Sequence, residues 1–211
     1  MKILKLLKKD ESNVIVYLDN GEKLYLTQEV IMMNGLRKNQ EISEDHFSFL
    51  INENKKFHIK QRAFRLLGRR LHSINELRIK LLQKDYEKEI VEKVLNELIV
   101  SRYLDDYRFS IMFTEEKIRT KLWGKNKIKA ELLKKKINPE IMDDVLKEKF
   151  PEGNFVNDAI TLAEKKLKSF SNRGFDNQKL KSKLFSFLYS RGYDFETSKE
   201  AINKIIGDDF N

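Results

Sequence analysis

The stretch LRIKLLQKDYEKEIVEKVL (residues 77–95) has a pattern of hydrophobic residues that occurs twice more in the chain. The second copy is IKAELLKKKINPEIMDDVL (128–146) and the third is LFSFLYSRGYDFETSKEAI (184–202), at offsets of 51 residues (77 to 128) and 56 residues (128 to 184). The six matched positions are Leu77, Leu81, Tyr86, Ile90, Val94 and Leu95, then Ile128, Leu132, Ile137, Ile141, Val145 and Leu146, and finally Leu184, Leu188, Tyr193, Thr197, Ala201 and Ile202. A pattern that keeps its register over several copies predicts a tandem repeat.

Each copy fits a helix, a short turn and a final helix, because its hydrophobic residues recur at the spacing of one helical face. A longer helix precedes each pair. We therefore predict a mostly α protein built from three-helix repeats, with approximate limits 57–104, 105–150 and 155–206. Each unit of such an array contacts only its neighbours, so we expect the repeats to form an elongated, curved array.

Several predicted helices have recognisable first residues. Ser73 followed by Glu76 forms a capping box, and Asp105 can cap the next helix, with Leu104 and Phe109 placed as a hydrophobic staple. Proline is tolerated at the first helical position, where its missing N–H would have no partner, and Pro139 follows the capping residue Asn138. Glycines suit helix ends, which we expect at Gly124, Gly192 and Gly207.

Residues 1–56 have a different pattern. The stretch SNVIVYLDNGEKLYLTQEV (12–30) predicts a β-hairpin, since Asp19, Asn20 and Gly21 tolerate the positive φ of a tight turn between two β-rich runs. Ile3 to Leu7 is a candidate third strand, and 29–36 and 43–51 are candidate short helices. We predict a small α+β domain over 1–56, with the polar run 52–56 (NENKK) as a linker.

The composition restricts the function classes. The chain has no cysteine and three histidines, with no HExxH spacing, no Gly-rich phosphate loop and no GxSxG motif. Adjacent acids such as Asp105 and Asp106 point about 100° apart on a helix and fit capping roles better than a paired acid–base site. We therefore expect no enzymatic activity, no metal and no cofactor. Because we find no signal peptide or spanning segment, we expect a cytoplasmic protein. We also expect it to be a monomer.

The net charge of +9 is unevenly distributed. Residues 1–56 contain nine basic and nine acidic side chains, whereas residues 117–136 contain nine basic residues and the single acid Glu131. Such a segment attracts a polyanion, although a solvated helix face is the alternative. The candidate binding residues are Arg65, Arg69, Arg70, Arg119, Lys121, Trp123, Lys125, Lys127, Lys129, Lys134, Lys135 and Lys136. Trp123 is either an anchor packed between helices or a contact residue for a partner or an exposed base.

Two strings, LLGRRLHSINEL (66–77) and RYLDDYRFS (102–110), carry a resemblance to a known family. They are similar to the start of the first repeat and to the Tyr-Leu-Asp-Asp signature of the RecX family of regulatory proteins. Further similar stretches are WGKNKIKAELLKKKI (123–137), FLYSRGYDFETSKEAI (187–202) and the hairpin YLDNGEKLYL (17–26). The chain departs from the family at Lys125, where proline is usual, and at Asp85 and Lys136, where glycine is usual.

The resemblance implies a regulator of the RecA recombinase that acts in DNA repair, homologous recombination and the SOS response. Such a regulator lies in the groove of the RecA–DNA nucleoprotein filament and inhibits filament extension, ATPase, strand exchange and coprotease activity. It has no catalytic residues or cofactor. The alternative is a protein that binds DNA directly through its basic helical face. The repeat and the charge alone predict only a polyanion binder.

Overall fold

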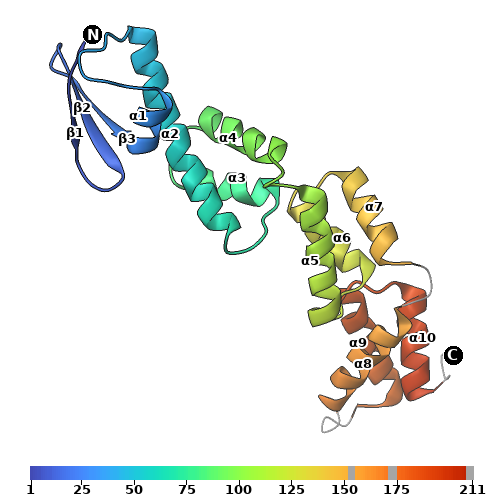
Figure 1. The fold of residues 1–211 in the computed structure, drawn as a ribbon. Coiled ribbons are helices and arrows are strands. Elements are labelled where there is room, and N and C mark those ends of the chain that lie inside the picture. Colours follow the sequence, from blue (N-terminus) through green and yellow to red (C-terminus); the bar gives the residue numbers. More distant parts are fainter. Residues whose placement is uncertain (152–154, 171–174, 208–211) are drawn as a thin grey trace. The chain divides into compact units, whose positions relative to one another are not determined.

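The computed structural model describes residues 1–151, 155–170 and 175–207, and its compact units are Met1–Leu104 and Asp105–Asn211 (Figure 1). The first unit contains β1 (Ile3–Lys8), β2 (Asn13–Leu18), β3 (Lys23–Thr27), α1 (Gln28–Met33), α2 (Glu44–Leu67), α3 (Ile74–Leu82) and α4 (Lys88–Val100). The second unit contains α5 (Asp106–Lys121), α6 (Lys125–Lys134), α7 (Pro139–Lys149), α8 (Val156–Lys168), α9 (Asn177–Ser190) and α10 (Phe195–Ile206).

The N-terminal sheet is antiparallel, with the order β1-β2-β3. Its inner face is buried at Val16, Leu18, Leu24 and Leu26, which form one core with residues of α1 and α2. The predicted hairpin is confirmed, and Gly21 has the positive φ of 86° that its turn requires. The third strand is confirmed as well. The first predicted helix is shorter than expected, since α1 ends at Met33.

The predicted linker at 52–56 is wrong, because this segment lies inside the continuous helix α2. Its polar side chains contact the N-terminal sheet on one side of the helix and the first repeat on the other. The side chain of Asn54 accepts a hydrogen bond from the Thr27 amide (2.8 Å) and donates one to the Tyr25 carbonyl (3.0 Å). Lys56 forms an ion pair with Glu97 of α4 (2.5 Å). The polar run is therefore helical because it bonds to the sheet and to the first repeat, and α2 contributes to both cores.

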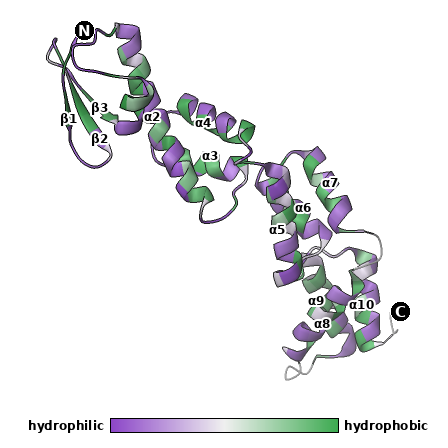
Figure 2. Ribbon diagram, viewed as in Figure 1, coloured by the Kyte–Doolittle hydropathy of each residue, from purple (hydrophilic) through white to green (hydrophobic). Residues whose placement is uncertain are grey.

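The prediction of three tandem three-helix repeats is confirmed. The first repeat is formed by the C-terminal part of α2 with α3 and α4, the second by α5 to α7, and the third by α8 to α10. Figure 2 shows hydrophobic residues on the sides of these helices that face their own repeat. The first, second, fifth and sixth matched positions are buried in every copy, as Leu81, Leu132 and Leu188 illustrate. Sequence periodicity therefore identified the core of each repeat.

Each repeat also has a left-handed residue at the same place. Asp85 (φ 56°), Lys136 (φ 56°) and Gly192 (φ 94°) occupy equivalent positions between the second and third helices of their repeats. Glycine adopts this conformation without steric cost, whereas L-residues do not. The two departures from the family pattern therefore lie at positions whose backbone would favour glycine.

The predicted helix starts are confirmed. Ser73 Oγ accepts a hydrogen bond from the Glu76 amide (3.1 Å), Asp105 accepts from Tyr107 and Arg108, and Asn138 accepts from Glu140 ahead of Pro139. These side chains satisfy amides that the first helical turn leaves without partners. Gly192 and Gly207 follow helix ends, whereas Gly124 is the N-cap residue that precedes α6.

Within the second unit, the second and third repeats are joined by their backbones. The Gly124 amide donates to the Arg191 carbonyl (2.9 Å), and the Asn126 amide donates to the Gly192 carbonyl (3.0 Å). The Tyr193 hydroxyl donates to the Leu122 carbonyl (2.9 Å). A Cβ added at Gly124 would lie 2.5 Å from the Gly192 oxygen, closer than real Cβ contacts come. Glycine at 124 is therefore required for this approach.

Candidate binding surface on the second repeat

The second repeat has a row of aromatic rings along α5 and the turn that follows it. Phe109 and Phe113, one helical turn apart, stack with their ring centroids 5.8 Å apart. Phe113 meets the Trp123 ring edge-on at a centroid distance of 6.4 Å. The Lys135 ammonium lies 5.6 Å from the centroid of Phe109 and 5.1 Å from that of Phe113. Such contacts stabilise a cation over the negative face of a ring.

Trp123 is half-buried between two further lysines. The Lys117 ammonium lies 6.0 Å from its ring centroid and the Lys127 ammonium 5.6 Å. Its Nε1 is buried and has no hydrogen-bond acceptor among the described residues. The Trp123 ring therefore packs the turn between α5 and α6, and the cations beside it are partly held by aromatic contacts.

Glu131, the one acid of the basic segment, has two lysine partners. Its carboxylate lies 2.8 Å from Lys134 and 3.6 Å from Lys127. The hydrogen bond from Lys134, together with the charges of both lysines, holds the pKa of Glu131 below its usual range. The carboxylate is therefore ionised at neutral pH and offsets part of the charge of these lysines.

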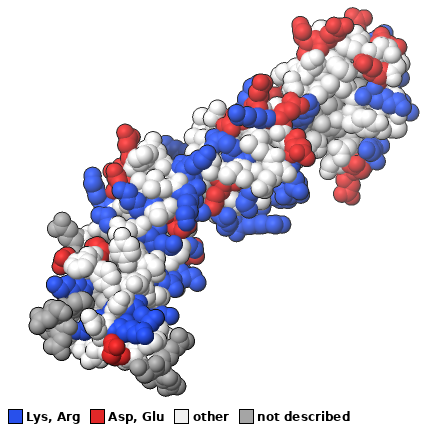
Figure 3. Space-filling view, turned by 180° about the vertical axis from the view of Figure 1, so that it is seen from behind, with Lys and Arg blue, Asp and Glu red and all other residues white. Residues whose placement is uncertain are grey.

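The remaining predicted cations of this repeat are exposed. They are Arg119 and Lys121 in the last turn of α5, Lys125 and Lys129 on α6, and Lys136 after it. Within the described part of the chain, no carboxylate lies within ion-pair distance of any of them. Figure 3 shows Lys and Arg side chains gathered on the visible face of this repeat. We call these five side chains the exposed cation set, because a polyanion can approach them without displacing a partner.

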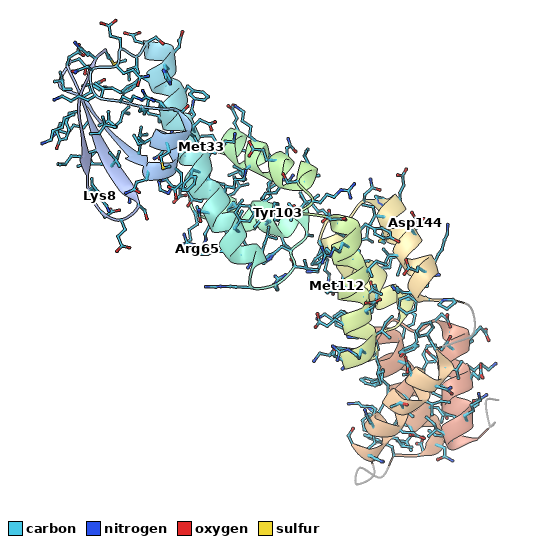
Figure 4. The ribbon with its side chains drawn as sticks, viewed as in Figure 1. Lys8, Met33, Arg65, Tyr103, Met112 and Asp144 are labelled. Carbon is cyan, nitrogen blue, oxygen red and sulfur yellow. The ribbon has the colours of Figure 1, made fainter. Side chains whose placement is uncertain are left out.

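The other three predicted cations lie in the first unit. Arg65 is exposed on α2, where Figure 4 labels it, and Arg69 is exposed in the turn that follows the helix. Arg70 is also exposed, but its guanidinium donates to the Leu71 carbonyl (2.7 Å) and to Glu76 (2.9 Å). The Arg70 guanidinium is therefore bound at the start of α3, whereas no such side-chain contact holds Arg65 or Arg69 among the described residues.

Sequence reasoning missed Phe109, Phe113 and Lys117 as neighbours of the candidate residues. Their spacing of four residues along α5 is a detectable signal, because such residues lie on one helical face. What the sequence does not show is that Lys135, from a different part of the repeat, lies over the rings of Phe109 and Phe113, and that Lys127 lies over the ring of Trp123.

Two kinds of site have no counterpart among the described residues, a group of metal ligands and a membrane-spanning helix. No three His, Asp or Glu side chains among them are grouped as metal ligands would be. None of the helices that the structure describes is both long and apolar enough to cross a bilayer.

Comparisons with known proteins agree with this architecture. The models of the first, second and third three-helix domains of RecX match residues 60–98, 105–146 and 156–202. The regulatory protein RecX of Clostridium acetobutylicum is 31% identical over 202 residues, which cover 95% of this chain and 94% of that protein. The regulatory protein RecX of Clostridium tetani is 28% identical over 204 residues, covering 96% and 92%.

Two solved structures share the fold. A crystal structure of regulatory protein RecX superposes with a TM-score of 0.75 at 23% identity and covers 99% of both chains. The crystal structure of RecX from Lactobacillus salivarius has a TM-score of 0.62 at 22% identity, covering 72% of this chain and 97% of that one.

The fold and the charged surface define a protein of tandem three-helix repeats that has the exposed cation set on its second repeat. The three family matches, and the relative with 31% identity over 95% of the chain, identify it further. The chain belongs to the RecX family of regulatory proteins.

Proposed function

We propose that this chain regulates the RecA recombinase by binding the groove of the RecA–DNA filament, without catalysing a reaction itself. Bound there, it inhibits filament extension, and with it ATPase, strand exchange and coprotease activity. Membership of a family of regulatory proteins supports the regulatory role. The observation that carries the proposed contact is the exposed cation set, which lies within the match to the second RecX domain.

The expected contact is electrostatic. A cationic surface speeds the approach of an anionic partner, and salt screens that attraction over a distance of about 8 Å at physiological ionic strength. A charge-reversal test should avoid the lysines that have contacts within the repeat, namely Lys127, Lys134 and Lys135. Their replacement by glutamate would also disturb the aromatic contacts or place a second negative charge beside Glu131. Lys121, Lys125 and Lys129 are exposed, and their reversal preserves those contacts.

The test is the ATPase rate of RecA from the same organism on single-stranded DNA, with increasing amounts of this protein. We expect suppression at protein levels below that of RecA, and its loss in the variant Lys121→Glu/Lys125→Glu/Lys129→Glu. The matched control reverses Lys84, Lys88 and Lys93, which are exposed in the first repeat, and so changes the net charge equally. If the wild type has no effect at equal concentration, the proposed function is wrong. If the control loses as much inhibition, the second repeat is not the contact.

Direct DNA binding is the second candidate, and the excess of nine basic residues over one acid in 117–136 favours it. Its test is binding of duplex DNA in the absence of RecA. We expect the logarithm of the association constant to fall with the logarithm of salt concentration by about 0.9 per phosphate contacted. Absence of binding at low salt would exclude this candidate.

A further inference from the structure

The N-terminal sheet has a second face that the helices do not cover. Helices α1 and α2 pack on the inner face, where Val16 and Leu24 are buried (Figure 1). Successive side chains of a strand point to opposite faces, so the residues between these buried ones lie on the other side. We call this side the outer sheet face, and it consists of Lys5, Leu7, Ile15, Tyr17, Lys23 and Tyr25.

The outer sheet face is arranged in two cross-strand rows. In the first, Tyr17 pairs with Lys5 on one side and Lys23 on the other. In the second, Ile15 pairs with Leu7 and with Tyr25. The two tyrosines are therefore diagonal neighbours on adjacent strands, a relation that places residues about 7–8 Å apart. Tyr25 is 56% exposed and Leu7 41% exposed, so the second row is open to solvent.

Lysines surround both rings. The Lys23 ammonium lies 5.2 Å from the ring centroid of Tyr17, and the Lys9 ammonium lies 5.1 Å from that of Tyr25. In the part of the chain that the structure describes, no carboxylate is within ion-pair distance of Lys5, Lys9 or Lys23. Lys8, labelled in Figure 4 at the end of β1, is exposed too, but it follows Leu7 in the strand and so belongs to the opposite side of the sheet. The face therefore combines two rings with cations that have no ionic partner.

The acids nearest the sheet lie in its turns, and two of them accept hydrogen bonds from backbone amides. Asp10 accepts hydrogen bonds from the amides of Ser12 (2.9 Å) and Asn13 (2.8 Å), and Asp19 accepts one from the amide of Lys2 (2.8 Å). These backbone hydrogen bonds hold the pKa of both aspartates below the usual range. Within the sheet itself, lysines therefore lie along the strands, whereas Asp10, Glu11, Asp19 and Glu22 lie in the turns that connect them.

We propose that the outer sheet face binds single-stranded nucleic acid, with bases stacked on Tyr17 and Tyr25 and phosphates near Lys5, Lys9 and Lys23. Aromatic rings beside a basic groove are the usual platform for unpaired bases. A duplex hides its base faces and would meet only the lysines. Base stacking is stronger than a cation–π contact at an exposed site, so a base can displace the lysine from the ring, and the freed ammonium then lies close to the phosphates.

The site is independent of the proposed contact with the RecA filament, and the test is designed to separate them. The full chain carrying Lys121→Glu/Lys125→Glu/Lys129→Glu is titrated against a fluorescein-labelled oligothymidylate of about 12 nucleotides, within the range that one stacking platform binds. The same titration uses a duplex of equal length. We expect the single strand to bind more tightly, with a salt dependence of about 0.7 logarithmic units for each phosphate contacted.

Two pairs of substitutions localise the binding. Tyr17→Ala/Tyr25→Ala should weaken binding of the oligothymidylate about 25-fold or more, on the basis of at least about fivefold for each ring. Tyr17→Phe/Tyr25→Phe keeps both rings and should bind within about twofold of its parent. Equal affinity of the alanine pair and the parent, or tighter binding of the duplex, would overturn the proposal. Absence of any binding at low salt would overturn it too.

Tryptophan fluorescence tests where the oligonucleotide binds, independently of how tightly it binds. Trp123 is the one tryptophan of the chain, so a variant with Trp123→Phe and Tyr25→Trp reports only from the sheet. Stacking of a base on this ring should quench its emission when the oligothymidylate is added, whereas the duplex should not. Unchanged emission under conditions where the oligonucleotide is bound would show that it binds elsewhere and that the proposal is wrong.

Discussion

The close approach of Gly124 to Gly192 gives a sharp prediction, because the substitution Gly124→Ala adds one methyl group where backbone atoms leave no room. The new Cβ would lie 2.5 Å from the Gly192 oxygen, 2.6 Å from its carbonyl carbon and 2.8 Å from the Tyr193 nitrogen. Gly124 has an ordinary φ of −77°, so alanine there is not strained by its own conformation. Gly124 is also the N-cap residue of α6, where alanine is disfavoured by about 1 kcal/mol, so most but not all of the effect comes from contact between the second and third repeats.

The magnitude follows from these distances. Ordinary van der Waals contact begins at 3.4 Å, so the two backbones must separate by about 0.9 Å. The hydrogen bonds from Gly124 to Arg191 (2.9 Å) and from Asn126 to Gly192 (3.0 Å) would then exceed bonding distance. Losing two hydrogen bonds costs about 2 kcal/mol, and residual overpacking costs about 1–2 kcal/mol more. We expect the contact to be weakened by about 2–4 kcal/mol.

Hydrogen exchange measures this change at the atoms concerned. The amides of Gly124 and Asn126 should lose protection by about 30-fold or more, since every 1.4 kcal/mol corresponds to a factor of ten. Trp123 adjoins the substituted residue, and its emission should change as the turn moves. Amides inside α9 and α10 should keep most of their protection, because the core of the third repeat is its own.

The control is Gly68→Ala in the first unit, where the added Cβ would meet only the Phe64 carbonyl at 3.3 Å. It should change the stability by less than about 1 kcal/mol. If Gly124→Ala left the protection of Gly124 and Asn126 within about threefold of the wild type, the close approach would not restrict this position, and the reasoning above would be refuted.

Three further predictions concern stability. Lys136→Gly should raise the free energy of unfolding by about 1 kcal/mol in urea titrations, because φ at this position is 56° and lysine is strained there; a decrease would contradict this. Arg78 donates two hydrogen bonds to Glu92 (2.6 and 3.0 Å), and these bonds hold the pKa of the Glu92 carboxyl below its usual range. A carboxyl whose pKa is lowered by folding stabilises the protein at pH values above its unfolded-state pKa, and this stabilisation is lost as the pH falls through the folded-state pKa. Arg78→Ala should therefore lower the free energy of unfolding by up to about 1 kcal/mol near neutral pH and make that free energy fall less steeply in acid. The free energies of unfolding of the wild type and of Arg78→Ala should therefore converge in acid, and a difference that stays constant with pH would count against this ion pair. Leu132→Ala, at a position that is 0% exposed, should cost about 2–5 kcal/mol, whereas Leu133→Ala, at one that is 51% exposed, should cost less than about 1 kcal/mol.

Patterns in the sequence predicted the elements whose causes are local. Hydrophobic residues one helical turn apart predicted the cores of the three repeats, and capping residues such as Ser73, Asp105 and Asn138 predicted helix starts, because each acts on amides two or three positions away. The hairpin was equally local, since the turn at Gly21 joins strands that are adjacent in the chain. The resemblance to RecX regulatory proteins likewise depended on short strings and their register.

Features that depend on residues far apart in the chain could be found in the three-dimensional structure alone. The run at 52–56 is helical because Asn54 bonds to the sheet and Lys56 to Glu97, partners that no local pattern reveals. The close approach of Gly124 to Gly192 joins positions 68 residues apart (124 to 192), and it explains a glycine that the sequence marked only as a helix end. The charge run predicted a cationic surface. Which lysines are held by rings or by Glu131, and which remain exposed, depends on packing between α5 and α6, because a count of charges contains no information about their partners.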